Sequence, residues 1–267
     1  MSDETSKSVD ILGIKPIGDA VKSVVDGSIA GVSAFLGRIC LPAAEEFGLL
    51  LQDKVSAWRT ANLIKLVQKA QAKLESRLDD GVCANPRLVA KVVDDGSWAS
   101  DEAIQEMWAG LLASSCTPGG QDDSNLLFMN LLNQLTVSEA RLVNYACSGA
   151  EKYVTAAGWV VPGELRAPVE ELRTAMGVDD YHRIDRELDH LRALQLLGED
   201  SGFGEKSTVA DISPTALALQ LFARCHGHGG SPIDFFNPKQ FVPPDPPRRV
   251  VLRTKTADAP SPDESNG

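Results

Sequence analysis

Apolar residues recur at helical spacing along most of the chain, and this pattern predicts a mainly α-helical protein. The first helix is expected from about residue 15 to residue 39, and a second begins near Pro42. No helix-breaking residue follows until Asp79-Asp80-Gly81, so the second helix is predicted to be long. Shorter helices are predicted over residues 88–93, 101–116 and 124–132, with N-caps at Ser100 and at Asp123 or Ser124.

The last third of the chain has a different pattern of elements. Thr136-Val-Ser-Glu139 is a capping box that starts a helix toward Ser148. Two further helices, over residues 168–176 and 179–197, precede a Gly-rich polar stretch and a β-like run at 208–212. A closing helix is expected to start at Pro214 and to end at Cys225. Three helices, a small two-stranded ribbon and a closing helix form a winged-helix-like order.

These patterns divide the chain of 267 residues into four parts, and a chain of this length accommodates one or two domains. We expect a multi-helix N-terminal and central domain followed by a winged-helix-like C-terminal domain. The predicted parts are a flexible arm at residues 1–13, a helical domain with a long basic helix at 14–133, a winged-helix-like domain at 134–226 and a disordered Pro-rich tail at 227–267.

The long second helix carries an unusual concentration of positive charge. Residues 54–77 contain six basic residues and one acidic residue, whereas the whole chain has a net charge of −11. A spacing of four residues aligns four of these bases along one helix face. They are Lys65, Lys69, Lys73 and Arg77. This face indicates either an anionic partner or a solvated surface balanced by nearby acids, and the second interpretation is favoured.

A stretch of small and apolar residues at 27–44 contains only one charge, Arg38. A charge at the centre of a bilayer costs about 2.5 to 3.5 kcal/mol on insertion scales, which disfavours a permanent transmembrane helix. A helix packed within the protein is favoured, and an interfacial or conditionally inserting helix is the alternative.

Nucleic-acid binding would fall to the predicted helix at 179–197, in the position of a recognition helix. That segment has five acidic residues against three arginines. Because affinity for nucleic acid comes largely from neutralised phosphates, a packing or protein-contact role is favoured.

The motifs of the common enzyme classes are missing from the sequence. It contains no GxSxG, P-loop, HExxH or Gly-rich dinucleotide turn, so we predict no catalytic residues and no cofactor. Cys225-His226-Gly-His228 is at most half of a zinc site, and we predict no metal. The five scattered cysteines are expected to be reduced thiols in the cytoplasm.

Trp58 and Trp108 lie at helical spacing among aliphatic residues and are predicted to be core anchors. The segments around them resemble the abortive-infection alpha family of bacterial phage-defence proteins. A Pro-Ala-Ala-Glu-Glu segment is followed by a Lys/Arg-x-x-x-Trp-Arg helix, and a later acid-capped helix contains Trp-Ala-x-Leu-Leu. The matching residues are Lys54, Trp58, Arg59, Trp108, Leu111 and Leu112. The chain departs from this pattern at Gly110, where the family suggests a polar residue, and at Trp98, where it suggests an acid.

This resemblance implies a phage-defence protein that halts growth of the infected cell or kills it. We expect no enzymatic activity, but a sensor or an effector that is cytoplasmic and peripheral to the inner membrane. Its expected partners are an anionic membrane surface or a phage or host protein, and it could form a homo-oligomer. Two other functions stay open, namely a nucleic-acid-binding regulator and a structural adaptor whose Pro-rich tail recruits a partner.

Overall fold

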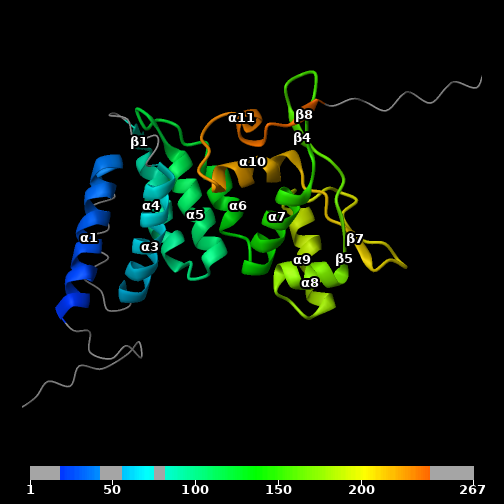
Figure 1. The fold of residues 1–267 in the computed structure, drawn as a ribbon, viewed down its shortest axis with the longest axis horizontal. Helices are drawn as coiled ribbons and strands as arrows, with labels where there is room; N and C mark the ends of the chain where they lie inside the picture. Colours follow the sequence, from blue (N-terminus) through cyan, green and yellow to red (C-terminus); the bar gives the residue numbers. More distant parts are fainter. Residues whose placement is uncertain (1–18, 43–55, 75–81, 241–267) are drawn as a thin grey trace, which may run out of the picture.

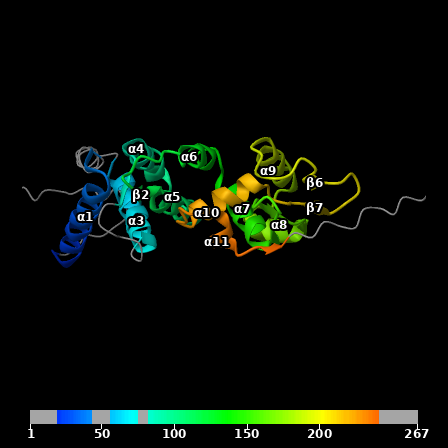
Figure 2. The same ribbon diagram turned by 90° about the horizontal axis from the view of Figure 1, so that it is seen from above.

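The computed structural model describes residues 19–42, 56–74 and 82–240. The described chain is mostly helical, as predicted, and its elements form an elongated row (Figures 1 and 2). Helices α1 (Asp19–Ile39) and α3 (Ser56–Leu74) lie at one end of this row. Helices α8 (Val169–Met176) and α9 (Tyr181–Ala193) lie toward the other end.

Helix α1 packs against α3 through a stripe of apolar side chains in its second half. Val32, Phe35, Leu36 and Ile39 are all buried there. The small-residue segment thus contributes to the protein core. No helix in the described ranges is long and apolar enough to span a bilayer. The parts of the predicted long helix before residue 56 and after residue 74 lie outside the described residues.

The central part of the row is built around α5 (Glu102–Ser115). It packs against α3, against α4 (Pro86–Asp94) and against α6 (Leu126–Leu132). A single 3₁₀ turn, η1 (Gly96–Trp98), joins α4 to α5 and also packs on α3. Two short strands that the sequence analysis did not predict, β1 (Val82–Ala84) and β2 (Cys116–Pro118), form an antiparallel pair.

The C-terminal part begins with α7 (Val137–Gly149), whose predicted capping box is confirmed. The next strands, β3 (Lys152–Val154) and β4 (Val160–Pro162), form an antiparallel hairpin that the sequence analysis did not predict. A second sheet contains β5 (Arg166–Pro168), β6 (Gly202–Phe203) and β7 (Val209–Asp211) in the order β5-β7-β6. The predicted two-stranded ribbon is therefore a three-stranded sheet, because β5 pairs with the free edge of β7.

The sequence analysis placed the start of the disordered tail too early, at residue 227. Helix α11 (Pro232–Phe236) and strand β8 (Lys239–Gln240) lie within the residues assigned to that tail. Phe235 and Phe236 pack on Phe222 of helix α10 (Ala216–Cys225), and β8 pairs in parallel with β3. The two phenylalanines are partly buried, and these contacts hold the segment on the protein despite its local Gly and Pro content.

Three predicted helix starts are wrong by one or more residues. Asp101 rather than Ser100 caps α5, since its carboxylate accepts a hydrogen bond from the Ala103 backbone amide. Asn125 precedes α6 in place of Asp123 or Ser124, and its side chain makes no cap hydrogen bond. Thr215 rather than Pro214 caps α10 through the Ala218 amide. Helix α9 is also shorter than predicted, since Gln195 adopts a positive φ of 58°.

One continuous cluster of buried apolar residues runs from α1 to α10. Helix α10 lies next to both α5 and α7, so it connects the core of the predicted helical domain with that of the predicted winged-helix-like domain (Figure 1). The two sequence-predicted domains therefore share a core.

Candidate functional site

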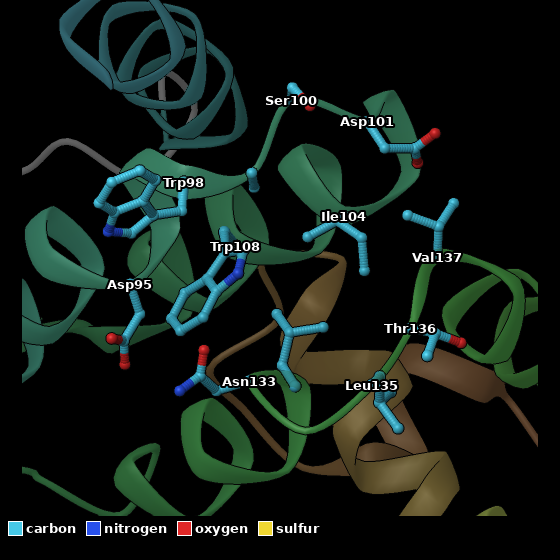
Figure 3. A pocket seen from close by; sticks show the side chains of 12 residues that line it. Asp95, Trp98, Ser100, Asp101, Ile104, Trp108, Asn133, Leu135, Thr136 and Val137 are labelled. Carbon is cyan, nitrogen blue, oxygen red and sulfur yellow. The ribbon is translucent and has the colours of Figure 1, made fainter. Parts of the chain in front are cut away.

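A groove of about 310 Å³ opens where η1 and the start of α5 face the connection between α6 and α7 (Figure 3). Apolar side chains dominate its lining. The buried indole of Trp108 and the side chains of Ile104 and Leu135 face it, and Trp98 lies at its edge. The lining residues are Asp95, Trp98, Ala99, Ser100, Asp101, Ile104, Trp108, Leu132, Asn133, Leu135, Thr136 and Val137.

Two apolar side chains of the groove remain exposed to solvent. Trp98 is 55% exposed and Val137 is 37% exposed. Large apolar side chains that stay in water at the edge of a concave surface are typical of contact sites for other molecules. The groove therefore offers an aromatic and aliphatic surface to a ligand.

Three of the five polar side chains that line the groove are already engaged within the protein. Asp101 caps α5 and forms an ion pair with Arg141, with an oxygen–nitrogen distance of 2.9 Å. Asp95 forms a 2.7 Å ion pair with Lys91, and Thr136 caps α7. These side chains fix the helix ends that shape the groove.

The signature residue Arg59 holds η1 in place from behind the groove. Its Nε donates to Ser97 Oγ at 2.9 Å, and its terminal nitrogen donates to the Asp94 carbonyl at 3.2 Å and the Val93 carbonyl at 3.4 Å. Its guanidinium also lies 4.7 Å from the centre of the Trp98 ring. These carbonyls belong to the last turn of α4, where a cation is favourable.

The two tryptophans predicted as core anchors occupy different environments. Trp108 is 2% exposed, so its predicted core position is confirmed, and Leu111 and Leu112 are fully buried. Trp58 is 38% exposed and packs instead on Trp98, with ring centres 6.0 Å apart. The prediction for Trp58 is wrong because helical spacing alone did not reveal that η1 presents a second exposed indole beside it. Lys54 lies outside the described residues.

Gly96 allows η1 to lie close to α3 and α5. A Cβ atom at this position would be 3.0 Å from Leu66 Cδ1 and 3.3 Å from the Trp108 ring. Asn62 of α3 adds a hydrogen bond to the Ser97 carbonyl at 3.2 Å. The turn that carries Trp98 is therefore packed and hydrogen-bonded on its inner side.

The predicted basic face is partly neutralised by two glutamates of α5. Lys69 pairs with Glu102 at 2.6 Å and with Glu106 at 3.2 Å, and Lys73 pairs with Glu106 at 2.9 Å. Lys65 is exposed, and it has no ion pair within the described part of the chain. Arg77 lies outside the described residues.

These ion pairs shift the titration of both partners. Burial alone would raise the pKa of Glu106, but the hydrogen bonds and charges of Lys73 and Lys69 lower it below its ordinary value. Burial alone would lower the pKa of Lys69, but the hydrogen bonds to Glu102 and Glu106 raise it. The basic face thus acts at least in part as a clamp between α3 and α5.

Glu106→Gln is expected to destabilise the protein at neutral pH by at most about 1 kcal/mol, because the pair is partly exposed. The stabilisation from a carboxylate with a lowered pKa is present above its unfolded pKa of about 4.3 and is lost as the pH falls below the folded value. The difference between variant and wild type should therefore be measurable by urea unfolding at pH 7 and should disappear at about pH 3.

The matched control is Glu205→Gln, since Glu205 is exposed and has no ion pair among the described residues. It should leave the unfolding midpoint unchanged at both pH values. A Glu106→Gln variant with wild-type stability at pH 7 would show that the clamp contributes nothing.

Two of the three arginines in α9 are also paired. Arg183 Nε lies 2.7 Å from Glu187, and Arg192 lies 2.6 Å from Asp189. In the last turn of α9, His190 Nδ1 lies 2.6 Å from a carboxylate oxygen of the buried Glu139, which belongs to the α7 capping box. The charges of α9 are thus used largely within the protein.

The Cys225-His226-Gly-His228 segment is engaged in local contacts. Burial raises the pKa of the Cys225 thiol, while His226 Nδ1 lies 2.7 Å from the Phe222 carbonyl and His228 Nε2 lies 2.9 Å from the Ser231 carbonyl. In the described ranges, no three His, Cys, Asp or Glu side chains are grouped as they would be around a metal ion.

The fold and the groove define a helical protein with a largely apolar groove between its helices and small β-sheets in its C-terminal part. Residues 59–211 match the model of the abortive infection alpha family, which is more than half of the chain. The chain therefore belongs to this family, as its sequence motifs suggested. No curated protein and no solved structure was found to match it. Every residue that lines the groove lies inside the matched segment.

The groove itself was missed in the sequence analysis. Trp98 attracted attention only as a departure from the family pattern, and Leu135 and Val137 were not singled out at all. A usable signal was the pair of helix starts at Asp101 and Thr136, because two capped helix ends that meet in space leave a hollow between them.

Proposed function

We propose that this protein acts in phage defence as a non-enzymatic sensor that binds a protein ligand in the groove beside Trp98. The observation that carries this proposal is that Asp95, Asp101 and Thr136 are committed to ion pairs and helix caps, while the indole of Trp98 is left exposed. An exposed aromatic anchor with internally satisfied polar neighbours suits recognition of an apolar side chain.

The size of the groove supports a side-chain ligand. About 310 Å³ lies at the lower limit of the range for sites that hold small molecules or cofactors, which is about 300 to 1,000 Å³. A phage or host protein that inserts one or two apolar side chains would fill such a volume.

The C-terminal module supports a protein-contact role as well. Apart from the β3–β4 hairpin inserted after α7, the order α7, β5, α8, α9, β6, β7, with β7 between the other two strands of its sheet, supports a winged-helix-like assignment. Arg183 and Arg192 of α9 are paired with acids of the same helix. Their charges are therefore less available to the phosphate backbone of nucleic acid, which favours a protein partner for α9. The pairing of Lys69 and Lys73 likewise favours a protein ligand over an anionic membrane.

Val137→Glu tests the groove while preserving the fold. Val137 is 37% exposed and occupies the first position of α7, where a negative charge is favourable to the helix. A carboxylate facing an apolar ligand is expected to weaken its binding by about tenfold or more. Cells that carry this variant should lose protection in a plaque assay with phages that the wild-type gene blocks.

Leu127→Glu is the matched control, because Leu127 is also an exposed aliphatic residue in the first turn of a helix but does not line the groove. This variant should protect like the wild type. Full protection by Val137→Glu, or equal loss in both variants, would remove the groove from the proposal. No protection by the unaltered gene against any phage in a broad panel would contradict the sensor role itself.

A further inference from the structure

A second groove, separate from the one beside Trp98, lies between the tip of the β3–β4 hairpin, α10 and α11. Its volume is about 560 Å³. Seven of its lining residues have apolar side chains and come from these three elements, namely Trp159, Val160, Val161, Ala216, Leu219, Pro232 and Ile233. No ionisable residue of the described chain lines it, so the groove suits an occupant that contacts it with apolar side chains.

Trp159 projects from a well-defined turn. The backbone amides of Thr155 and Gly158 and the Thr155 hydroxyl all take part in hydrogen bonds that close the turn, and Gly158 has a φ of 83° that favours glycine. Despite this fixed position, Trp159 is 69% exposed, more than any other large hydrophobic residue whose exposure is described. A rigid turn that holds an indole in solvent beside an apolar groove provides a contact surface for an occupant.

The described chain ends at the mouth of this groove. Strand β8 runs parallel to β3, with Tyr153 opposite Lys239 and Val154 opposite Gln240. Lys239 fixes this register through a 2.5 Å ion pair with Glu151. The residue that follows on β3 is Thr155, which lines the groove. Gln240, the last described residue, therefore lies next to the hairpin, one residue before the level of Thr155.

The sequence that follows has the chemistry that the groove requires. Residues 241–247 read Phe-Val-Pro-Pro-Asp-Pro-Pro. Proline has no backbone amide hydrogen, so these residues cannot extend β8 as a regularly paired strand. Proline-rich segments bind instead by placing their rings against aromatic side chains, and seven residues in a polyproline conformation span about 22 Å.

We propose that residues 241–247 of this chain bind in the groove formed by the hairpin tip, α10 and α11, with their prolines against the Trp159 indole. Three features support an occupant from the same chain: the chain direction set by β8, the apolar lining, and the proline content of the next residues. The segment would cover Trp159 and join the tail to the hairpin.

Fluorine NMR of the full chain labelled with 5-fluorotryptophan tests this proposal. The sequence has four tryptophans, and Trp159→Phe identifies the resonance of Trp159. The full chain with Pro243→Glu and Pro244→Glu should shift that resonance and make it more sensitive to replacement of H₂O by D₂O. The same two changes at Pro260 and Pro262 serve as the matched control and should leave it unchanged.

The resonance of the buried Trp108 reports whether the fold is intact and should stay constant in both variants. An unchanged Trp159 resonance in the Pro243→Glu, Pro244→Glu variant would overturn the proposal. So would a Trp159 resonance in the wild-type chain that changes on dilution, since the segment would then come from a second copy.

Discussion

Gly110→Ala is expected to prevent stable folding or to lower the free energy of unfolding by at least about 3 kcal/mol. A Cβ atom on Gly110 of α5 would lie 1.6 Å from the carbonyl oxygen and 2.1 Å from the carbonyl carbon of Cys225, the last residue of α10. A clash with backbone cannot be relieved by a change of side-chain rotamer. The helix would have to move away, and α10 is also packed against α7 and α11.

Urea unfolding followed by far-UV circular dichroism measures this loss. If the protein still folds, a loss of about 3 kcal/mol should lower the melting temperature by roughly 6 to 12 °C in a chain of this size. Gly31→Ala is the matched control, because nothing lies within 4 Å of a Cβ atom at that exposed position of α1. Alanine there should be neutral or stabilise the helix by up to about 1 kcal/mol. Equal midpoints for both variants would show that α5 and α10 are not in such close contact.

Gly110 also illustrates what a single sequence reveals about this fold. The helices were predictable because their apolar spacing and their caps are local, as in the confirmed capping box of Thr136 and Glu139. The requirement for glycine at position 110 was not predictable, because it arises from a backbone more than a hundred residues later in the chain. The same limit applies to strand β5, whose three residues become a strand only through pairing with β7.

In the candidate site, too, features set by local spacing were predictable from the sequence, whereas contacts between distant segments were not. The alignment of Lys65, Lys69 and Lys73 on one face follows from their spacing, but the acidic partners of Lys69 and Lys73 lie on another helix. Only the packing of α3 on α5 brings Glu102 and Glu106 to Lys69 and Lys73. The groove beside Trp98 likewise combines two segments, residues 95–108 and 132–137, that are separated by more than twenty residues. The sequence thus predicted the signature residues but not the surface that they support.

Arg59→Leu is expected to lower the free energy of unfolding by about 2 to 3 kcal/mol and to loosen the turn that carries Trp98. Leucine preserves apolar packing but removes the donors to Ser97 Oγ and to two carbonyls of α4, together with the cation over the Trp98 ring. Ser97 is fully buried, so water cannot replace the lost donor there without opening the turn.

In the Arg59→Leu variant, backbone hydrogen exchange in α4 and η1 should therefore be faster than in the wild type. Exchange in α9, which Arg59 does not contact, should stay the same. Lys65→Leu is the matched control on the same helix, because it also removes one positive charge but from an exposed side chain. That variant should keep the wild-type unfolding midpoint and exchange pattern. Arg59→Lys should show most of the loss, since one ammonium group cannot reach the serine and both carbonyls in the geometry of a guanidinium. If Arg59→Lys were as stable as the wild type, charge alone rather than this hydrogen-bonding geometry would hold the turn, and Arg59 would not be what positions Trp98 at the groove.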